Sequence, residues 1–123
     1  MKDIVLYCKS FNRDVLRAKR LVESVENFNI ENLDFYLSVP DSDRKLFLDV
    51  IGSNRCIWIS DEEIVLANPH ASIERMHKTS GYFSQQVVKS EFWRLCISEN
   101  YLCLDSDSMF IQNFTKADFL APD

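Results

Sequence analysis

The chain has 123 residues, of which 46% are hydrophobic, 12% aromatic and 27% charged, a length and composition typical of a single globular domain over residues 1–123. Its net charge of −5 disfavours a nucleic-acid-binding protein, because such proteins usually present a basic face. No apolar run approaches membrane-spanning length and no two of the four cysteines form a C-x-x-C pair, so we expect a cytoplasmic protein with reduced thiols, without a transmembrane segment but open to peripheral membrane association.

The first elements alternate between extended and helical patterns. The run of residues 4–8 is apolar without alternation, which predicts a strand buried on both faces. Apolar residues then recur at helical spacing over residues 15–28, and we expect an amphipathic helix that ends near residues 27–29 with Asn12 as its N-cap. Residues 35–39 predict a second strand, which Pro40 ends.

A helix is expected next, from the capping residues 41–43 to about Ile51, with Gly52 as its C-terminal signal. Residues 56–59 predict a short third strand. The segment 61–80 is the least regular, and we interpret Asp61-Glu62-Glu63 as a solvated run or a helix start.

The last third of the chain predicts a long helix from Tyr82 to about Ser98, because its apolar residues share one broad face. Residues 101–104 predict a fourth, buried strand. An extended apolar run follows at residues 109–111, and residues 117–120 predict a further short strand.

This order of strands and helices predicts an α/β fold of Rossmann-like type, with three α/β/α layers around a mostly parallel sheet. Such sheets bind ligands beyond the carboxyl ends of their strands. Functional residues are therefore expected just after each strand, in the segments 9–13, 40–43, 60–63 and 105–108.

The strongest chemical signal is Asp105-Ser106-Asp107 after the fourth strand. Two carboxylates at such a short separation repel each other unless a cation or a hydrogen-bond donor neutralises them. Hard divalent cations prefer oxygen ligands and often share them with substrate phosphates. The pattern predicts an Mn²⁺ or Mg²⁺ site at Asp105 and Asp107, and the alternative is a polar turn after a core strand.

Two further groups of polar residues accompany this signal. On the preceding helix, Gln86 and Lys89 stand three residues apart, and we place them in the N-terminal half, where the helix dipole favours anions. After the first strand, Lys9, Ser10 and Arg13 could contact a base, a ribose or a phosphate. The alternative for both groups is an ordinary solvated or capping role. Trp58 and Trp93 are interpreted as core residues.

Three segments together resemble a known family. They are residues 81–89, GYFSQQVVK, residues 101–110, YLCLDSDSMF, and the opening residues 3–14. The chain resembles a bacterial family of largely uncharacterised glycosyltransferase-like proteins of the GT-A, nucleotide-diphospho-sugar transferase superfamily. The similarity in pattern spans nearly the whole chain, and its distinctive parts are the Gln-Gln and D-x-D segments.

The resemblance implies a nucleotide-diphospho-sugar donor whose diphosphate is bridged to the D-x-D by Mn²⁺ or Mg²⁺. By position, Asp107 would be the main metal ligand and Asp105 would contact the ribose or the metal through water. Lys89 and Gln86 would face the diphosphate or sugar, and Lys9, Ser10 and Arg13 would line the nucleotide pocket. Together with Asp105, these residues would bind the donor.

A complete GT-A domain is about twice as long as this chain, so the resemblance implies an N-terminal part, a truncated GT-A fold. The half that holds the acceptor-binding residues and the catalytic base would lie outside it. The implied reaction is transfer of a sugar to a saccharide or other acceptor hydroxyl, and the catalytic residues are unknown.

Two other functions stay open on the sequence. One is a non-catalytic sugar-nucleotide-binding or interaction module. The other is a haloacid-dehalogenase-like phosphatase with Asp105 as nucleophile and Asp107 as acid/base. The phosphatase is disfavoured because its motif usually opens the domain, and the residues after Asp107 are too few to hold its remaining motifs.

Overall fold

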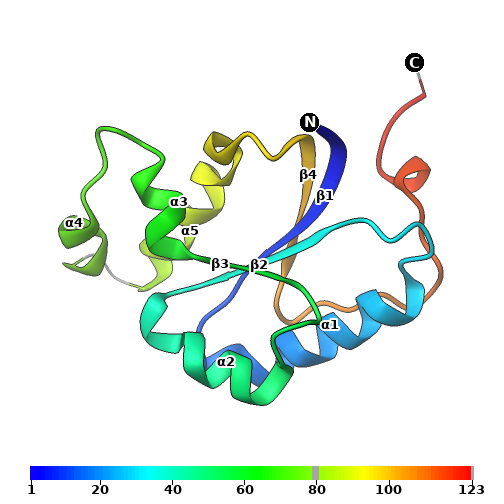
Figure 1. Ribbon diagram of the computed structural model, residues 1–123, viewed down its shortest axis with the longest axis horizontal. Helices are drawn as coiled ribbons and strands as arrows, with labels where there is room; N and C mark the ends of the chain where they lie inside the picture. Colours follow the sequence, from blue (N-terminus) through cyan, green and yellow to red (C-terminus); the bar gives the residue numbers. More distant parts are fainter. Residues whose placement is uncertain (79–80, 123) are drawn as a thin grey trace.

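The computed structural model describes residues 1–78 and 81–122. Within these described residues, four strands and five α-helices make up the framework (Figure 1). The strands are β1 (Lys2–Lys9), β2 (Phe35–Val39), β3 (Ile57–Ser60) and β4 (Ser98–Asp105). The α-helices are α1 (Val15–Phe28), α2 (Arg44–Ile51), α3 (Asp61–Leu66), α4 (Ile73–Lys78) and α5 (Gly81–Glu91). Short 3-10 helices are η1 (Asn12–Asp14), η2 (Asp41–Asp43), η3 (Phe92–Leu95) and η4 (Lys116–Asp118).

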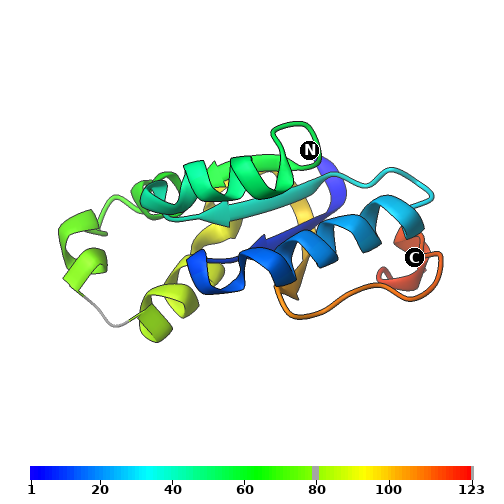
Figure 2. The same cartoon turned by 90° about the horizontal axis from the view of Figure 1, so that it is seen from below.

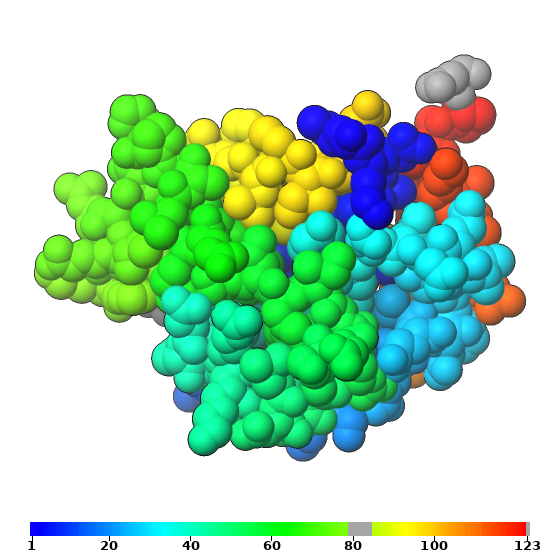
Figure 3. All heavy atoms as spheres, viewed as in Figure 1, coloured from blue at the N-terminus to red at the C-terminus, as the bar shows by residue number. Residues whose placement is uncertain are grey.

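The four strands form one sheet in the order β3-β2-β1-β4, and every strand pair in it is parallel. Strand β1 lies inside this sheet, and its residues 4–9 are all buried. Figure 3 shows one face of the molecule with all its atoms. Later segments, in green, cyan and yellow, cover most of that face, and the dark-blue first residues are visible mainly near the N-terminus. The expected α/β arrangement with a first strand buried on both faces is confirmed.

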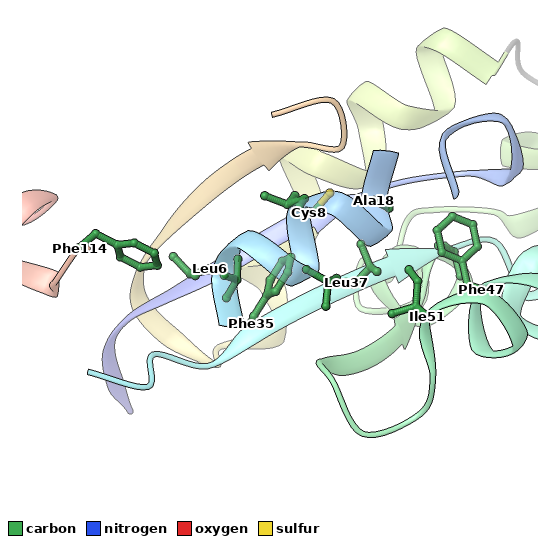
Figure 4. Packing of buried hydrophobic residues seen from close by; sticks show 12 residues of the cluster. Leu6, Cys8, Ala18, Phe35, Leu37, Phe47, Ile51 and Phe114 are labelled. Atoms are coloured by element: carbon green, nitrogen blue, oxygen red, sulfur yellow. The ribbon is translucent and has the colours of Figure 1, made fainter. Parts of the chain in front are cut away.

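Helices cover the two faces of the sheet, and each face has its own core (Figure 2). On one face, alternate residues of β1 and β2, among them Leu6 and Leu37, pack with α1 and α2. Figure 4 shows these side chains in a row that runs from Phe114 to Phe47. On the other face, Tyr7 packs with residues of α3 and α5 and stacks on Phe92, with ring centroids 3.9 Å apart. The side chains of β1 therefore point alternately into two hydrophobic cores, as expected for a strand between two helical layers.

Most of the predicted elements in the first half of the chain are confirmed. The first helix ends at Phe28 and the second at Ile51, followed by Gly52 with a φ of 105° that suits glycine. The predicted N-cap is wrong, because Asn12 does not cap α1. Its backbone N–H and its side-chain amide both donate to Asp43, at 2.9 and 3.3 Å.

The second half departs further from the sequence prediction. Helix α5 ends at Glu91, short of the predicted Ser98, and the chain passes through η3 to Cys96, which has a left-handed φ of 54°. Strand β4 is an edge strand with exposed residues, and the prediction of a buried fourth strand is wrong. The predicted strand over residues 117–120 is also wrong, since η4 occupies this region.

Membrane crossing can be judged from helix length and hydropathy. Over residues 1–78 and 81–122, the helices are all too short or too polar to span a bilayer.

Candidate functional site

The carboxyl ends of the strands bring the predicted functional segments to one edge of the sheet. In the β1–β4 register Lys9 lies opposite Asp105, and in the β1–β2 register it lies opposite Ser38. At the other side of β2, Val39 lies opposite Ser60, which is followed at once by Asp61. Segments far apart in the sequence therefore end side by side, which is the usual position for ligands in a parallel α/β sheet.

The outermost pair at this edge joins β4 to α5. Lys89 Nζ lies 3.1 Å from Asp105 Oδ1, and the Lys89 side chain is 21% exposed while that of Asp105 is 71% exposed. The hydroxyl of Tyr101 donates to the backbone carbonyl of Lys89 at 3.2 Å and ties the helix to the strand. The structure thus brings together two of the predicted site residues on a surface that solvent and ligands can reach.

The turn that follows β4 presents the second aspartate. Asp107 is exposed, and its backbone carbonyl accepts a hydrogen bond of 3.3 Å from Arg20 Nη2 on α1. Within the turn, the backbone N–H and the hydroxyl of Ser108 both donate to the carbonyl of Asp105, at 3.0 and 2.6 Å. Both carboxylates of the D-x-D therefore stand at the surface on a hydrogen-bonded turn.

An inner ion pair lies beneath this surface and joins β1 to α3. Lys9 Nζ lies 2.9 Å from Asp61 Oδ2, with the two side chains only 2% and 5% exposed. Lys9 Nζ also donates to the backbone carbonyl of Ser10. The interpretation of Asp61-Glu62-Glu63 as a solvated run is wrong for Asp61, whereas its reading as a helix start is confirmed, with the Ser60 hydroxyl as N-cap.

Burial dominates the electrostatics of this inner pair. It raises the pKa of Asp61 to about 6, and the attraction of the Lys9 ammonium opposes the rise without cancelling it. Next to the pair, Tyr7 Oη and Ser38 Oγ share a hydrogen bond of 2.8 Å, and burial also raises the pKa of Tyr7. Asp61, an acid directly after a strand, and Lys9 were each in a predicted functional segment, but nothing in the sequence indicated that the two would pair.

The remaining predicted site residues are spread over different depths. Ser10 is fully buried, like Lys9, whereas Arg13 lies exposed on η1. Gln86 is exposed on α5. The prediction that Lys89 lies in the N-terminal half of its helix is wrong, because α5 ends soon after and Lys89 falls in its last turn. The helix dipole therefore does not strengthen anion binding at the Lys89 position.

Trp93 also departs from its expected place in the core. Its side chain is 56% exposed on η3, and the guanidinium of Arg94 lies 4.6 Å from the centre of its ring. Trp58 is partly buried and packs edge-on against Phe47, as expected for a core residue.

The capacity of this edge to hold a cation depends on its oxygen donors. In the part of the chain that the structure describes, no three His, Cys, Asp or Glu side chains gather closely enough to form a complete metal site. Asp105 and Asp107 can supply two carboxylates. Mg²⁺ is commonly held by one or two carboxylates together with substrate phosphates and water. The donor set fits a cation shared with a phosphorylated ligand.

A separate hollow of about 390 Å³ lies at the other end of the strands, near the amino ends of β2 and β3. It is bordered by the end of α1, the start of β2 and the start of β3, and Arg55 binds Glu26 at its rim. No residue of the D-x-D turn contributes to it. Its position at the amino ends of the strands separates it from the site described above.

Comparison with known proteins places the chain in a family. A family model described as a family of unknown function, DUF6492, matches residues 3–123. No curated protein matches the sequence.

Proposed function

Because the chain belongs to DUF6492, a family of unknown function, we propose its function from the site itself. The protein binds a nucleotide-diphospho-sugar together with Mn²⁺ or Mg²⁺. It acts as a metal-dependent glycosyltransferase, or as the donor-binding part of one, and transfers the sugar to a saccharide or other hydroxyl acceptor. The GT-A resemblance of the sequence suggests this reaction class.

The observation that carries the proposal is the meeting of Lys89 and Asp105 at the surface, 3.1 Å apart. A carboxylate beside an ammonium offers a ligand for a cation and a positive charge for an anion at the same place. A diphosphate with its metal ion presents both charges. The exposed Asp107 adds the second carboxylate.

Each residue of the edge has a role in this proposal. Asp105 and Asp107 would hold the metal ion, which offsets the negative charge on the departing nucleoside diphosphate. Lys89 binds a phosphate oxygen, and Gln86 and Arg13 contact more distant parts of the donor. The buried Lys9 and Ser10 support the floor of the donor site from below, because neither side chain reaches the surface.

The proposed location is the cytoplasm. All four cysteines are free thiols. Free thiols are usual in reducing compartments.

A thermal-shift screen tests the proposal. UDP-, GDP-, CMP- and dTDP-sugars are added with and without Mn²⁺, and one donor is expected to stabilise the fold only when Mn²⁺ is present. At 100 times the dissociation constant the stabilisation is about 2.7 kcal/mol. Asp107→Ala should abolish this shift, and Asp49→Asn, a change of an exposed acid on α2, should keep it.

The screen also has an outcome that would reject the proposal. The absence of a shift with every donor, or a shift of equal size in Asp107→Ala, would exclude the D-x-D as the donor site. A donor that binds without any hydrolysis or transfer would instead favour the non-catalytic module.

A further inference from the structure

The middle residue of the D-x-D differs from its neighbours in exposure. Ser106 is 7% exposed, whereas Asp105 and Asp107 on either side are exposed. The Ser106 hydroxyl donates to Asp14 Oδ2 at 3.2 Å, across 92 positions of sequence. Because Ser106 is held inward, the two flanking carboxylates are held outward.

Asp14 occupies a position where an aspartate usually serves its own helix. It is the N-cap residue of α1, yet its side chain makes no capping hydrogen bond. Its two oxygens accept from Ser106 and from Arg17 Nη1, each at 3.2 Å. A side-chain capping bond ordinarily stabilises a helix, so the carboxylate forgoes a common stabilising contact in favour of the D-x-D turn.

A second side chain of α1 reaches the same turn. Arg20 Nη2 donates to the backbone carbonyl of Asp107 at 3.3 Å. The turn is thus held at Ser106 from one point of α1 and at Asp107 from another. Two attachments define the orientation of a short turn better than one, and they act together with the contacts of Ser108 within the turn.

We propose that Asp14, acting through Ser106, is a positioning residue that holds the carboxylates of Asp105 and Asp107 in the orientation that receives the metal–diphosphate group; Arg20 assists from the same helix. The inference rests on the proposed function for its ligand. Asp14 is not a third metal ligand, since among residues 1–78 and 81–122 no three acidic, His or Cys side chains lie close enough to share an ion.

The first test measures the turn itself and needs no ligand. Amide hydrogen exchange is followed at Ser108, whose N–H donates to the Asp105 carbonyl. Asp14→Ala should speed exchange at Ser108 and leave the β1 amides unchanged. Asp14→Asn retains an oxygen that accepts from Ser106 and should behave like the wild type. Arg17→Gln, the matched control, removes the other partner of Asp14 and should also have no effect.

The second test measures the consequence for metal binding. Mn²⁺ alone is titrated into each variant and followed by the electron paramagnetic resonance of the free ion. Residues that orient metal ligands typically change affinity by 10–100-fold, and for an exposed turn we expect about tenfold weaker binding in Asp14→Ala. Asp14→Asn should restore the wild-type affinity, which a loss of general stability would not do.

Each outcome decides the inference. Unchanged Ser108 exchange in Asp14→Ala would overturn it, even if Mn²⁺ affinity falls, because Asp14 would then act on the ion directly. If Asp14→Ala loosens β1 as well, Ser106→Ala removes the same hydrogen bond from the turn, and unchanged Ser108 exchange in that variant would overturn it. Faster exchange at Ser108 with no Mn²⁺ binding by the wild type would reject the proposed function while upholding the role of Asp14.

Discussion

Two lysine–aspartate pairs stand at the same edge of the sheet and have opposite surroundings. Lys9 and Asp61 lie 2.9 Å apart with side chains 2% and 5% exposed, and Lys89 and Asp105 lie 3.1 Å apart with side chains 21% and 71% exposed. The two pairs have nearly the same distance between their charged atoms and differ in their exposure to solvent. Water screens the outer pair and leaves its charges open to a ligand, while the inner pair is shielded from both water and a surface ligand.

The register makes this contrast sharper. Lys9 lies opposite Asp105 in the β1–β4 ladder, but its ammonium binds Asp61. Side chains alternate along a strand, so Lys9 shares the face of Tyr7, which α3 and α5 cover. Asp61 is the first residue of α3. The helical layer therefore supplies the partner of Lys9, and Asp105 is left for Lys89.

The largest expected effect comes from breaking the inner pair. Asp61→Ala leaves the Lys9 ammonium buried without its carboxylate, and the free energy of unfolding should fall by about 3–5 kcal/mol. Urea unfolding measures this loss. The double variant Lys9→Met with Asp61→Leu removes both charges and should recover most of it. A loss below about 1 kcal/mol, the usual range for exposed pairs, would show that the inner pair is solvated after all.

The pH dependence of stability gives a smaller effect with a definite sign. Burial raises the pKa of Asp61 to about 6, above its ordinary value of 3.8, with the Lys9 ammonium opposing the rise. Between these values the folded state binds more protons than the unfolded state. The stabilisation from this group is therefore complete below about pH 4 and is lost as the pH rises through about 6.

A comparison with Asp61→Asn isolates this contribution. The difference in unfolding free energy between the wild type and the variant should decrease by at most about 3 kcal/mol from pH 4 to pH 7. Other carboxylates titrate in both proteins and largely cancel. A difference that stays constant, or that increases with pH, would contradict the assignment to Asp61.

The smallest effect on stability is expected at the outer pair. Lys89→Met should change the free energy of unfolding by less than about 1 kcal/mol, because the Asp105 side chain remains solvated without its partner. The same variant should weaken binding of the donor found in the thermal-shift screen. A stability loss comparable with that of Asp61→Ala would remove the distinction between the two pairs.

Much of the framework was predictable because short-range patterns determine it. The unbroken apolar run of β1 indicated a strand with two buried faces, and the helical spacing after it indicated α1. The boundaries of α5 and β4 were less predictable. Phe92 lies just after the end of α5, and its ring stacks on Tyr7 of β1. Helical periodicity carries no information about such a contact between distant residues.

The site was predictable to the same extent. Parallel strands carry functional residues at their carboxyl ends, so Asp105 and Asp107 could be named in advance as candidates. Lys89 was named from its helix, although its expected place in the N-terminal half was wrong. The role of these residues as a donor site stays a prediction. The hydrogen bond between Asp14 and Ser106 and the ion pair between Asp61 and Lys9 could not be predicted. Both are acids at helix starts, where capping is the ordinary expectation, and their partners lie 92 and 52 positions away.

The sequence by itself determined the succession of elements from β1 to β3, the parallel sheet and the segments that meet at the carboxyl ends of its strands, since apolar periodicity and chain direction are local properties. Only the tertiary structure decided that β4 lies at an edge, that Lys9 is buried with Asp61, and that Asp14 turns from its own helix to Ser106. The physical reason is that alternation specifies the face on which a side chain lies, whereas the charge it meets there depends on how the helical layers pack.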